Sequence, residues 1–287
     1  MPAAAVYGIR MNVIQLADIR SAIEPEPNAW ARHELSRFLR LWRARLKPAD
    51  VGLPSHGIRR VSGLRREEVA ELAGVSVTWY TAFELGSAPR ISLRFASAIV
   101  EALRLDRAER TFLFALLGTP LVCASSGHGD ALEAVVEPGD STACALLNGD
   151  LGVVSTNAAF RRLFGTGSGH FVEGLFRDAA LRGTFIDWDD AARFGTGALR
   201  MQLARGRDGA RRIYEALRRD PVFEEHWEAG ALYDPADARL ALRIRDPQSD
   251  TMSVHIDAIG IGGWGLLMVV SGADDCAKQR LRRLTAA

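Results

Sequence analysis

Residues 65–86, RREEVAELAGVSVTWYTAFELG, restrict the fold more narrowly than any other part of the chain. Apolar residues recur at helical spacing before Gly74 and again after it, so the segment predicts two short amphipathic helices. Gly74 interrupts the pattern, and Ser76 follows at the place where a side-chain oxygen caps a new helix. Gly86 then marks the end of the second helix. The block therefore predicts two helices that meet at a tight turn.

The second predicted helix has one apolar face and one face left free for contact. Val75, Tyr80 and Phe83 share the side that can pack on the first helix. A helix of about ten residues is about 15 Å long and fits across the major groove of DNA, which is about 12 Å wide. We therefore expect the other side to meet base edges. Its residues are Ser76, Val77, Thr78, Thr81 and Ala82, with Trp79 at the boundary between groove and core.

Charge is distributed unevenly along the chain, although the net charge is only +1. Residues 32–110 contain 15 basic and 9 acidic side chains, whereas residues 111–287 contain 19 basic and 23 acidic ones. A basic segment joined to a mildly acidic one is typical of a nucleic-acid-binding domain followed by a domain that does not bind nucleic acid. We expect five arginines to contact phosphates, with a solvated surface role as the alternative. They are Arg59, Arg60, Arg65, Arg66 and Arg90.

Further helical patterns surround this block. One amphipathic pattern precedes it and stops at Pro48, which cannot continue a helix. Two more follow it, the first capped by Ser92 and the second opened by the capping-box residue Asp106. The sequence therefore predicts an all-α, five-helix domain over residues 30–118, preceded by a flexible tail of residues 1–29.

Several short motifs occur together in residues 31–118. They are ELSRFL at 34–39, a long loop with Pro48, Gly52 and the pair Arg59–Arg60, GLRREEV at 63–69, GVS at 74–76 and FLFAL at 112–116. With these motifs the segment resembles the lambda-repressor-like (XRE) helix-turn-helix family, and more narrowly the MmyB-like regulators. The resemblance implies a transcription regulator that reads double-stranded DNA as a homodimer, on two half-sites about 34 Å apart.

The resemblance is incomplete on the predicted reading helix. The family pattern is replaced by Thr78-Trp79-Tyr80 and by residues 82–85, Ala-Phe-Glu-Leu. A second hypothesis therefore stays open, in which the DNA-binding domain has decayed and the chain is a sensor that binds another protein.

A different pattern begins after a Gly-, Ser- and Pro-containing linker, residues 119–140. Short apolar runs on either side of Asn148-Gly149-Asp150 predict a β-hairpin over residues 143–155. Helical patterns occupy 157–164 and most of 171–227, with glycine breaks expected at 195–197 and 206–209. The remaining predicted strands are 239–244, 252–259 and 266–270.

Three blocks of this second half resemble the PAS-like ligand-binding domain of the same regulators: 143–165, 175–189 and 219–227. The resemblance implies an α+β PAS-like domain over residues 141–287, in which helices cover a small antiparallel sheet. It also implies an apolar cavity that holds a fatty-acid-like ligand, and no other cofactor. We expect large apolar side chains to line that cavity, with an ordinary core role as the alternative. They are Phe160, Phe164, Phe171, Phe176, Trp188, Phe223 and Trp227.

Enzyme, metal and membrane functions find no support in the sequence. Residues 260–265 spell GxGxxG, but strand-like runs flank them, so we interpret them as a hairpin connection rather than a phosphate-binding turn. The histidines and the three cysteines lack metal-ligand spacing. No apolar run reaches the roughly 20 residues of a membrane-spanning helix. We therefore expect no catalytic residue, no metal site, no membrane partner and a cytoplasmic location.

Overall fold

Helices α2 (Arg66–Leu72) and α3 (Val77–Glu84) meet at the predicted turn, where Gly74 has a φ of 66°. Glycine adopts this left-handed conformation without the clash of a Cβ atom. The computed structural model describes residues 29–54, 63–88, 91–118, 142–165, 169–233, 239–248, 250–261 and 265–286. The predicted linker, Arg59, Arg60 and Arg90, and all but the last residue of the predicted tail lie outside these residues.

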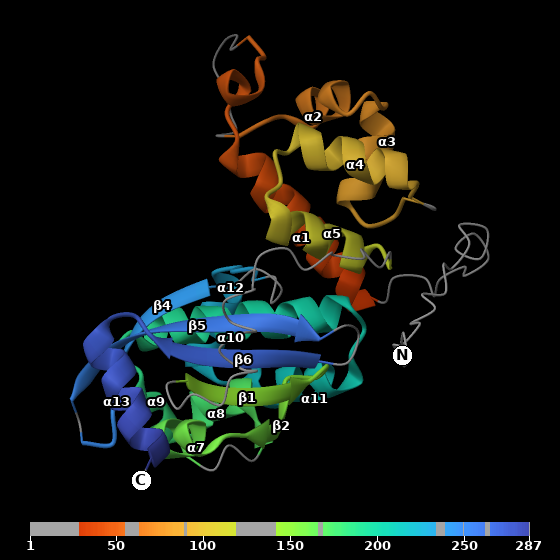
Figure 1. The fold of residues 1–287 in the computed structure, drawn as a ribbon. Helices are drawn as coiled ribbons and strands as arrows, with labels where there is room; N and C mark the ends of the chain where they lie inside the picture. Colours follow the sequence, from red (N-terminus) through yellow and green to blue (C-terminus); the bar gives the residue numbers. More distant parts are fainter. Residues whose placement is uncertain are drawn as a thin grey trace, which may run out of the picture.

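Three longer helices enclose this pair: α1 (Ala29–Arg45), α4 (Leu93–Ala102) and α5 (Arg107–Leu116), with the short 3₁₀ helix η2 (Pro48–Val51) after α1 (Figure 1). The Oγ atom of Ser76 accepts the backbone N–H of Trp79 at 3.2 Å, and Ser92 caps α4 in the same way. Asp106 and Glu109 accept each other's backbone N–H groups at 2.9 Å. These caps confirm the predicted starts of α3, α4 and α5.

One apolar core holds these helices together. Its most completely buried side chains come from all five α-helices of this domain. Each helix therefore contributes to the same core. They are Leu39, Val69, Tyr80, Phe83, Ile99, Phe112 and Leu113. Met201 and Ala204, which belong to the second half of the chain, are part of the same buried cluster.

The described residues of the second half form one antiparallel sheet of six strands in the order β3-β2-β1-β6-β5-β4. The strands are β1 (Thr142–Asn148), β2 (Gly152–Thr156), β3 (Gly169–His170), β4 (Arg239–Arg245), β5 (Thr251–Ile261) and β6 (Gly265–Gly272). Ile261 pairs with Gly265, so the glycine-rich segment joins two antiparallel strands, as predicted. The predicted β1–β2 hairpin is also confirmed.

Helices fill the connection between β2 and β4 and follow β6. They are α7 (Ala158–Phe164), α8 (Phe171–Arg177), α9 (Ala179–Thr184), α10 (Trp188–Ala204), α11 (Asp208–Leu217), α12 (Pro221–Glu228) and α13 (Asp275–Ala286). Figure 1 shows α8 and α10 against one face of the sheet and α1 above the end of α10. The expected α+β architecture is confirmed, and α13, which the sequence analysis did not predict, buries Ala277 and Leu281.

The predicted helix break at residues 195–197 is wrong, because α10 runs through it without interruption. A Cβ atom on Gly195 would lie 2.8 Å from Leu175 Cδ1, and one on Gly197 would lie 2.7 Å from Tyr233 Cδ2. These glycines therefore allow close packing of a buried helix rather than ending it. The break at 206–209 is confirmed, since α10 ends at Ala204 and α11 begins at Asp208. Within the described residues no helix is long and apolar enough to cross a bilayer.

A candidate DNA-reading surface and ligand cavity

Helix α3 carries a free face beside its buried one. Tyr80 and Phe83 are fully buried, and the first turn contains no acidic side chain that would repel phosphate. The partial positive charge at a helix N-terminus adds to this preference for anions. The opposite face consists of hydroxyl and methyl groups, the kinds that contact base edges. Ser76, Val77 and Thr78 are exposed there, and Thr81 and Ala82 are half-buried.

Trp79 lies at the edge of that face, as predicted. Its ring centroid is 4.0 Å from that of Phe95 and 5.9 Å from that of Phe83. The indole is half-buried, so it joins α3 to α4 while part of its surface stays accessible. Trp79 therefore fixes the position of the free face relative to the rest of the domain.

A buried carboxylate holds the other end of α3. The side chain of Glu84 is 0% exposed and accepts Arg43 Nε from α1 and Arg66 Nε from α2, each at 2.8 Å. Burial alone would raise the pKa of Glu84, but the hydrogen bonds from both arginines outweigh it and lower the pKa below 4.5. Burial and the nearby Glu84 raise the pKa of Tyr80, so its hydroxyl stays neutral. Glu84 thus links α1, α2 and α3. We call the side chains of Glu84, Arg43 and Arg66 the Glu84 clamp.

The predicted phosphate contacts divide into two kinds. Arg65 is exposed at the start of α2. Arg66 is bound into the Glu84 clamp, although 40% of its side chain remains exposed. Arg59, Arg60 and Arg90 lie outside the described residues. Arg66 therefore has a structural partner that the sequence analysis did not predict, and its contact with phosphate stays a prediction.

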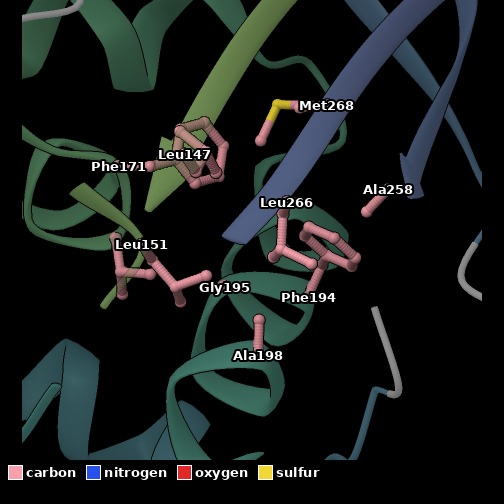
Figure 2. Close-up of a pocket in the computed structure, with 10 residues that line it drawn as sticks. Leu147, Leu151, Phe171, Phe194, Gly195, Ala198, Ala258, Leu266 and Met268 are labelled. Carbon is pink, nitrogen blue, oxygen red and sulfur yellow. The ribbon is translucent and has the colours of Figure 1, made fainter. Parts of the chain in front are cut away.

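A small cavity lies between α10, α8 and the sheet (Figure 2). Its volume is about 10 Å³, room for about one water molecule. All its lining side chains are apolar, so the cavity suits hydrocarbon and offers no partner to a charge. Phe194, Gly195 and Ala198 come from α10, Phe171 and Val172 from α8, and Leu147, Leu151, Ala258, Leu266 and Met268 from the sheet and its β1–β2 turn.

Two family matches agree with this geometry. Residues 34–113 match a helix-turn-helix domain family. Residues 129–284, more than half of the chain, match the family of the MmyB-like transcription regulator ligand binding domain. The chain belongs to the MmyB-like transcription regulators. No curated protein matches it. This MmyB-like regulator is therefore a DNA-binding transcription regulator with a ligand-sensing domain, and both matched families are regulatory rather than enzymatic.

Most side chains predicted to bind the ligand form the aromatic core of the MmyB-like regulator instead of lining its cavity. Phe171 is the member of the predicted set that contacts the cavity. The rings of Phe160 and Phe164 pack against each other at an interplanar angle of 49°, with centroids 4.8 Å apart. The others form a second cluster, with centroid distances from 5.1 to 5.6 Å. That cluster contains Phe176, Trp188, Phe223 and Trp227.

Sequence reasoning missed the residues that give the cavity its shape in this MmyB-like regulator. Gly195 and Ala198 leave room beside α10 because they are small, whereas the sequence prediction selected large aromatic residues. The available signal was the run Gly195-Thr-Gly-Ala198 inside an otherwise helical pattern. Glu84 was missed as well, and no local signal identifies it, because its partners Arg43 and Arg66 lie 41 and 18 residues away along the chain.

Proposed function

We propose that this MmyB-like regulator reads a specific sequence of double-stranded DNA by placing the first turns of α3 in the major groove. The observation that carries the proposal is the division of α3 into a fully buried apolar face and a free face of small hydroxyl and methyl groups. Such groups discriminate base pairs through hydrogen bonds and contact with the thymine methyl group. We also propose a homodimer, because helix-turn-helix proteins read two half-sites about one helical turn apart.

Arginine contacts would orient the regulator on DNA without reading its sequence. Arg65 is exposed next to the N-terminus of α2, where it can approach a phosphate. The exposed part of Arg66 can do the same while its Nε atom stays on Glu84. Arg59, Arg60 and Arg90 complete the proposed set. Ser76, Val77, Thr78, Trp79, Thr81 and Ala82 form the proposed reading face.

Substitution of the threonines tests the reading face. We expect Thr78→Ala or Thr81→Ala to weaken binding to the preferred site by about 1–3 kcal/mol and to affect random DNA little, because base contacts carry the sequence information. Arg65→Ala should weaken binding to both DNAs alike. Affinities would be measured by fluorescence anisotropy at fixed salt, on a site selected from a random DNA pool.

Thr251→Ala is the matched control, because Thr251 is exposed in the sensing domain. It should change neither affinity. If Thr78→Ala and Thr81→Ala weaken both DNAs equally, α3 is not the reader. The exposed Val77 and Leu85 would then favour the other hypothesis, in which the face binds a protein.

We further propose that the sensing domain is PAS-like and binds a fatty-acid-like ligand between α10 and the sheet. Without the two-residue β3, its strand order is β2-β1-β6-β5-β4, with the helices α7 to α12 inserted between β2 and β4. The apolar lining supports a hydrocarbon chain as the ligand. A volume of about 10 Å³ means that such a chain must separate α10 from the sheet as it enters.

Thermal unfolding with dodecanoate and tetradecanoate tests this proposal. A ligand that binds only the folded domain, at about 100 times its Kd, stabilises it by about 2.7 kcal/mol. We expect this to raise the Tm of the sensing domain by about 5–10 °C. Ala198→Leu fills the cavity and should remove the shift, whereas Ala241→Leu, at an exposed position of β4, should keep it. Equal shifts in both variants would place the ligand elsewhere.

A further inference from the structure

Helix α10 is shared by the cavity and the helix-turn-helix domain. Gly195 and Ala198 line the cavity. Met201, three residues after Ala198 and about 4.5 Å further along the helix axis, is fully buried in the core of the other domain. Ala204 belongs to the same core, and α10 also contacts α5. A displacement of α10 at the cavity therefore cannot leave this contact unchanged, because buried side chains transmit strain.

Buried charges strengthen the contact between α10 and α1. The Arg200 side chain is 0% exposed and that of Glu34 is 4% exposed, with Arg200 Nε 3.3 Å from Glu34 Oε2. Arg200 also donates to the carbonyl oxygens of Ala231, at 2.8 Å, and Trp227. Its guanidinium carbon lies 4.0 Å from the centroid of the Trp227 ring and 5.4 Å from that of Phe38 in α1. Arg200 is thus a desolvated cation that joins the sensing domain to α1.

The same ion pairs are incompletely hydrogen-bonded. Within the described residues, Glu34 Oε2 and Arg200 Nε complete no hydrogen bond, and neither does Arg37 Nη1. Arg37 nevertheless reaches across to α12, where its Nη2 donates to the backbone oxygen of Glu228 at 2.6 Å. Buried charges with unfilled hydrogen-bonding capacity stabilise an interface less than fully satisfied ones. The contact between α1 and the sensing domain is therefore held by ion pairs that are not a fully satisfied polar network.

Helix α1 connects this contact to the reading helix. It has 17 residues and is about 25 Å long. Glu34 and Arg37, near its start, face the sensing domain, whereas Arg43, near its end, donates to Glu84 at the end of α3. A tilt of α1 at Glu34 therefore moves the Glu84 clamp and, with it, α3.

We propose that α10 couples the cavity to DNA reading: an occupant that displaces Gly195 and Ala198 shifts Arg200 and Met201, and thereby tilts α1 and α3. This inference rests on the proposed function of the cavity and of α3, and it adds the physical connection between them. It predicts that filling the cavity from the sheet side, through a residue outside both α10 and α1, loosens α1.

Hydrogen–deuterium exchange on the full chain tests the coupling without DNA or ligand. Ala258 lies on β5, lines the cavity and packs against Phe194 of α10, so Ala258→Leu acts as a fixed occupant. We expect the backbone amides of α10 and α1 to exchange at least about tenfold faster than in the unmodified protein. The matched control is Ala241→Leu, the same substitution at an exposed position of the neighbouring strand, which should leave both helices unchanged.

Faster exchange in α10 with unchanged α1 would overturn the proposal, and so would unchanged exchange in both helices. If Ala258→Leu fails to fold, Gly195→Ala decides, because its new Cβ meets Leu175 Cδ1 at 2.8 Å. Its control is Gly183→Ala in α9, where a Cβ meets nothing within 4 Å. Both exchange experiments are done without DNA or lipid. They therefore test the coupling between α10 and α1 even if the proposed DNA or fatty-acid binding proves wrong.

Discussion

Glu84→Ala is expected to destabilise the helix-turn-helix domain by about 3–5 kcal/mol, because it leaves a mostly buried guanidinium without its carboxylate. The Arg43 side chain is 15% exposed and would lose both of its hydrogen bonds to Glu84. Arg66 is more exposed and can turn towards water at lower cost. The free energy of opening would be measured by native-state hydrogen exchange of the α2 and α3 amides, since a two-domain chain need not unfold in one step.

Two comparisons separate this effect from a general loss of charge. Glu71→Ala removes an exposed carboxylate from α2 and should cost less than about 0.5 kcal/mol. If Glu84→Ala lowers the stability by no more than Glu71→Ala does, Arg43 and Arg66 do not need Glu84 to compensate their charge. The double variant Arg43→Met with Glu84→Ala should be more stable than Glu84→Ala alone, because no buried charge is then left unpaired.

The same clamp gives the domain a defined dependence on pH. Since folding lowers the pKa of Glu84, the unfolded chain binds its proton more readily. The stabilising contribution of Glu84 is therefore fully present above pH 4.5 and decreases as the pH falls through the lowered folded-state value. In Glu84→Gln this part of the acid sensitivity should disappear. An unchanged pH profile in that variant would contradict the assigned pKa direction.

Arg200→Met is expected to weaken the contact between the domains by up to about 3–5 kcal/mol, because the buried Glu34 then loses its nearer arginine and keeps the more distant Arg37, whose Nη1 lies 3.7 Å from Glu34 Oε2. Arg193→Met is the matched control: it lies on the same helix, is 51% exposed and pairs with an exposed aspartate, so it should cost less than about 0.5 kcal/mol. Exchange of the α1 and α10 amides would report both. Adding Glu34→Gln to Arg200→Met should recover part of the loss, and no recovery would mean that Glu34 is not the cause.

Local signals predicted the turn before α3 and the N-caps of α3 and α5 well. Gly74, Ser76 and Asp106 could be interpreted from the sequence because turns and caps involve residues only a few positions apart. The Glu84 clamp could not, since Arg43 and Arg66 lie 41 and 18 residues away along the chain. A carboxylate at the end of a helix has the same appearance in sequence whether it faces water or two arginines.

The cavity was harder to predict than the fold around it. Large aromatic residues such as Phe160 and Phe223 were reasonable ligand contacts, but in the structure they fill space themselves. Room remains where Gly195 and Ala198 face the sheet, and this depends on the packing of α8 and α10 across many intervening residues. A glycine in a sequence indicates either a break or a close approach, and only tertiary contacts distinguish the two.

The strand order also determines when each domain can form during synthesis. The central strands β1 and β6 are neighbours in space, but Gly272 is translated about 150 residues after the end of α5. At about 5–20 residues per second, the helical domain precedes completion of the sheet by roughly 8–30 s. During that interval the helix-turn-helix domain is already translated, but the sensing domain is not yet complete. Met201 and Arg200 therefore cannot yet make their final contacts with the helix-turn-helix domain.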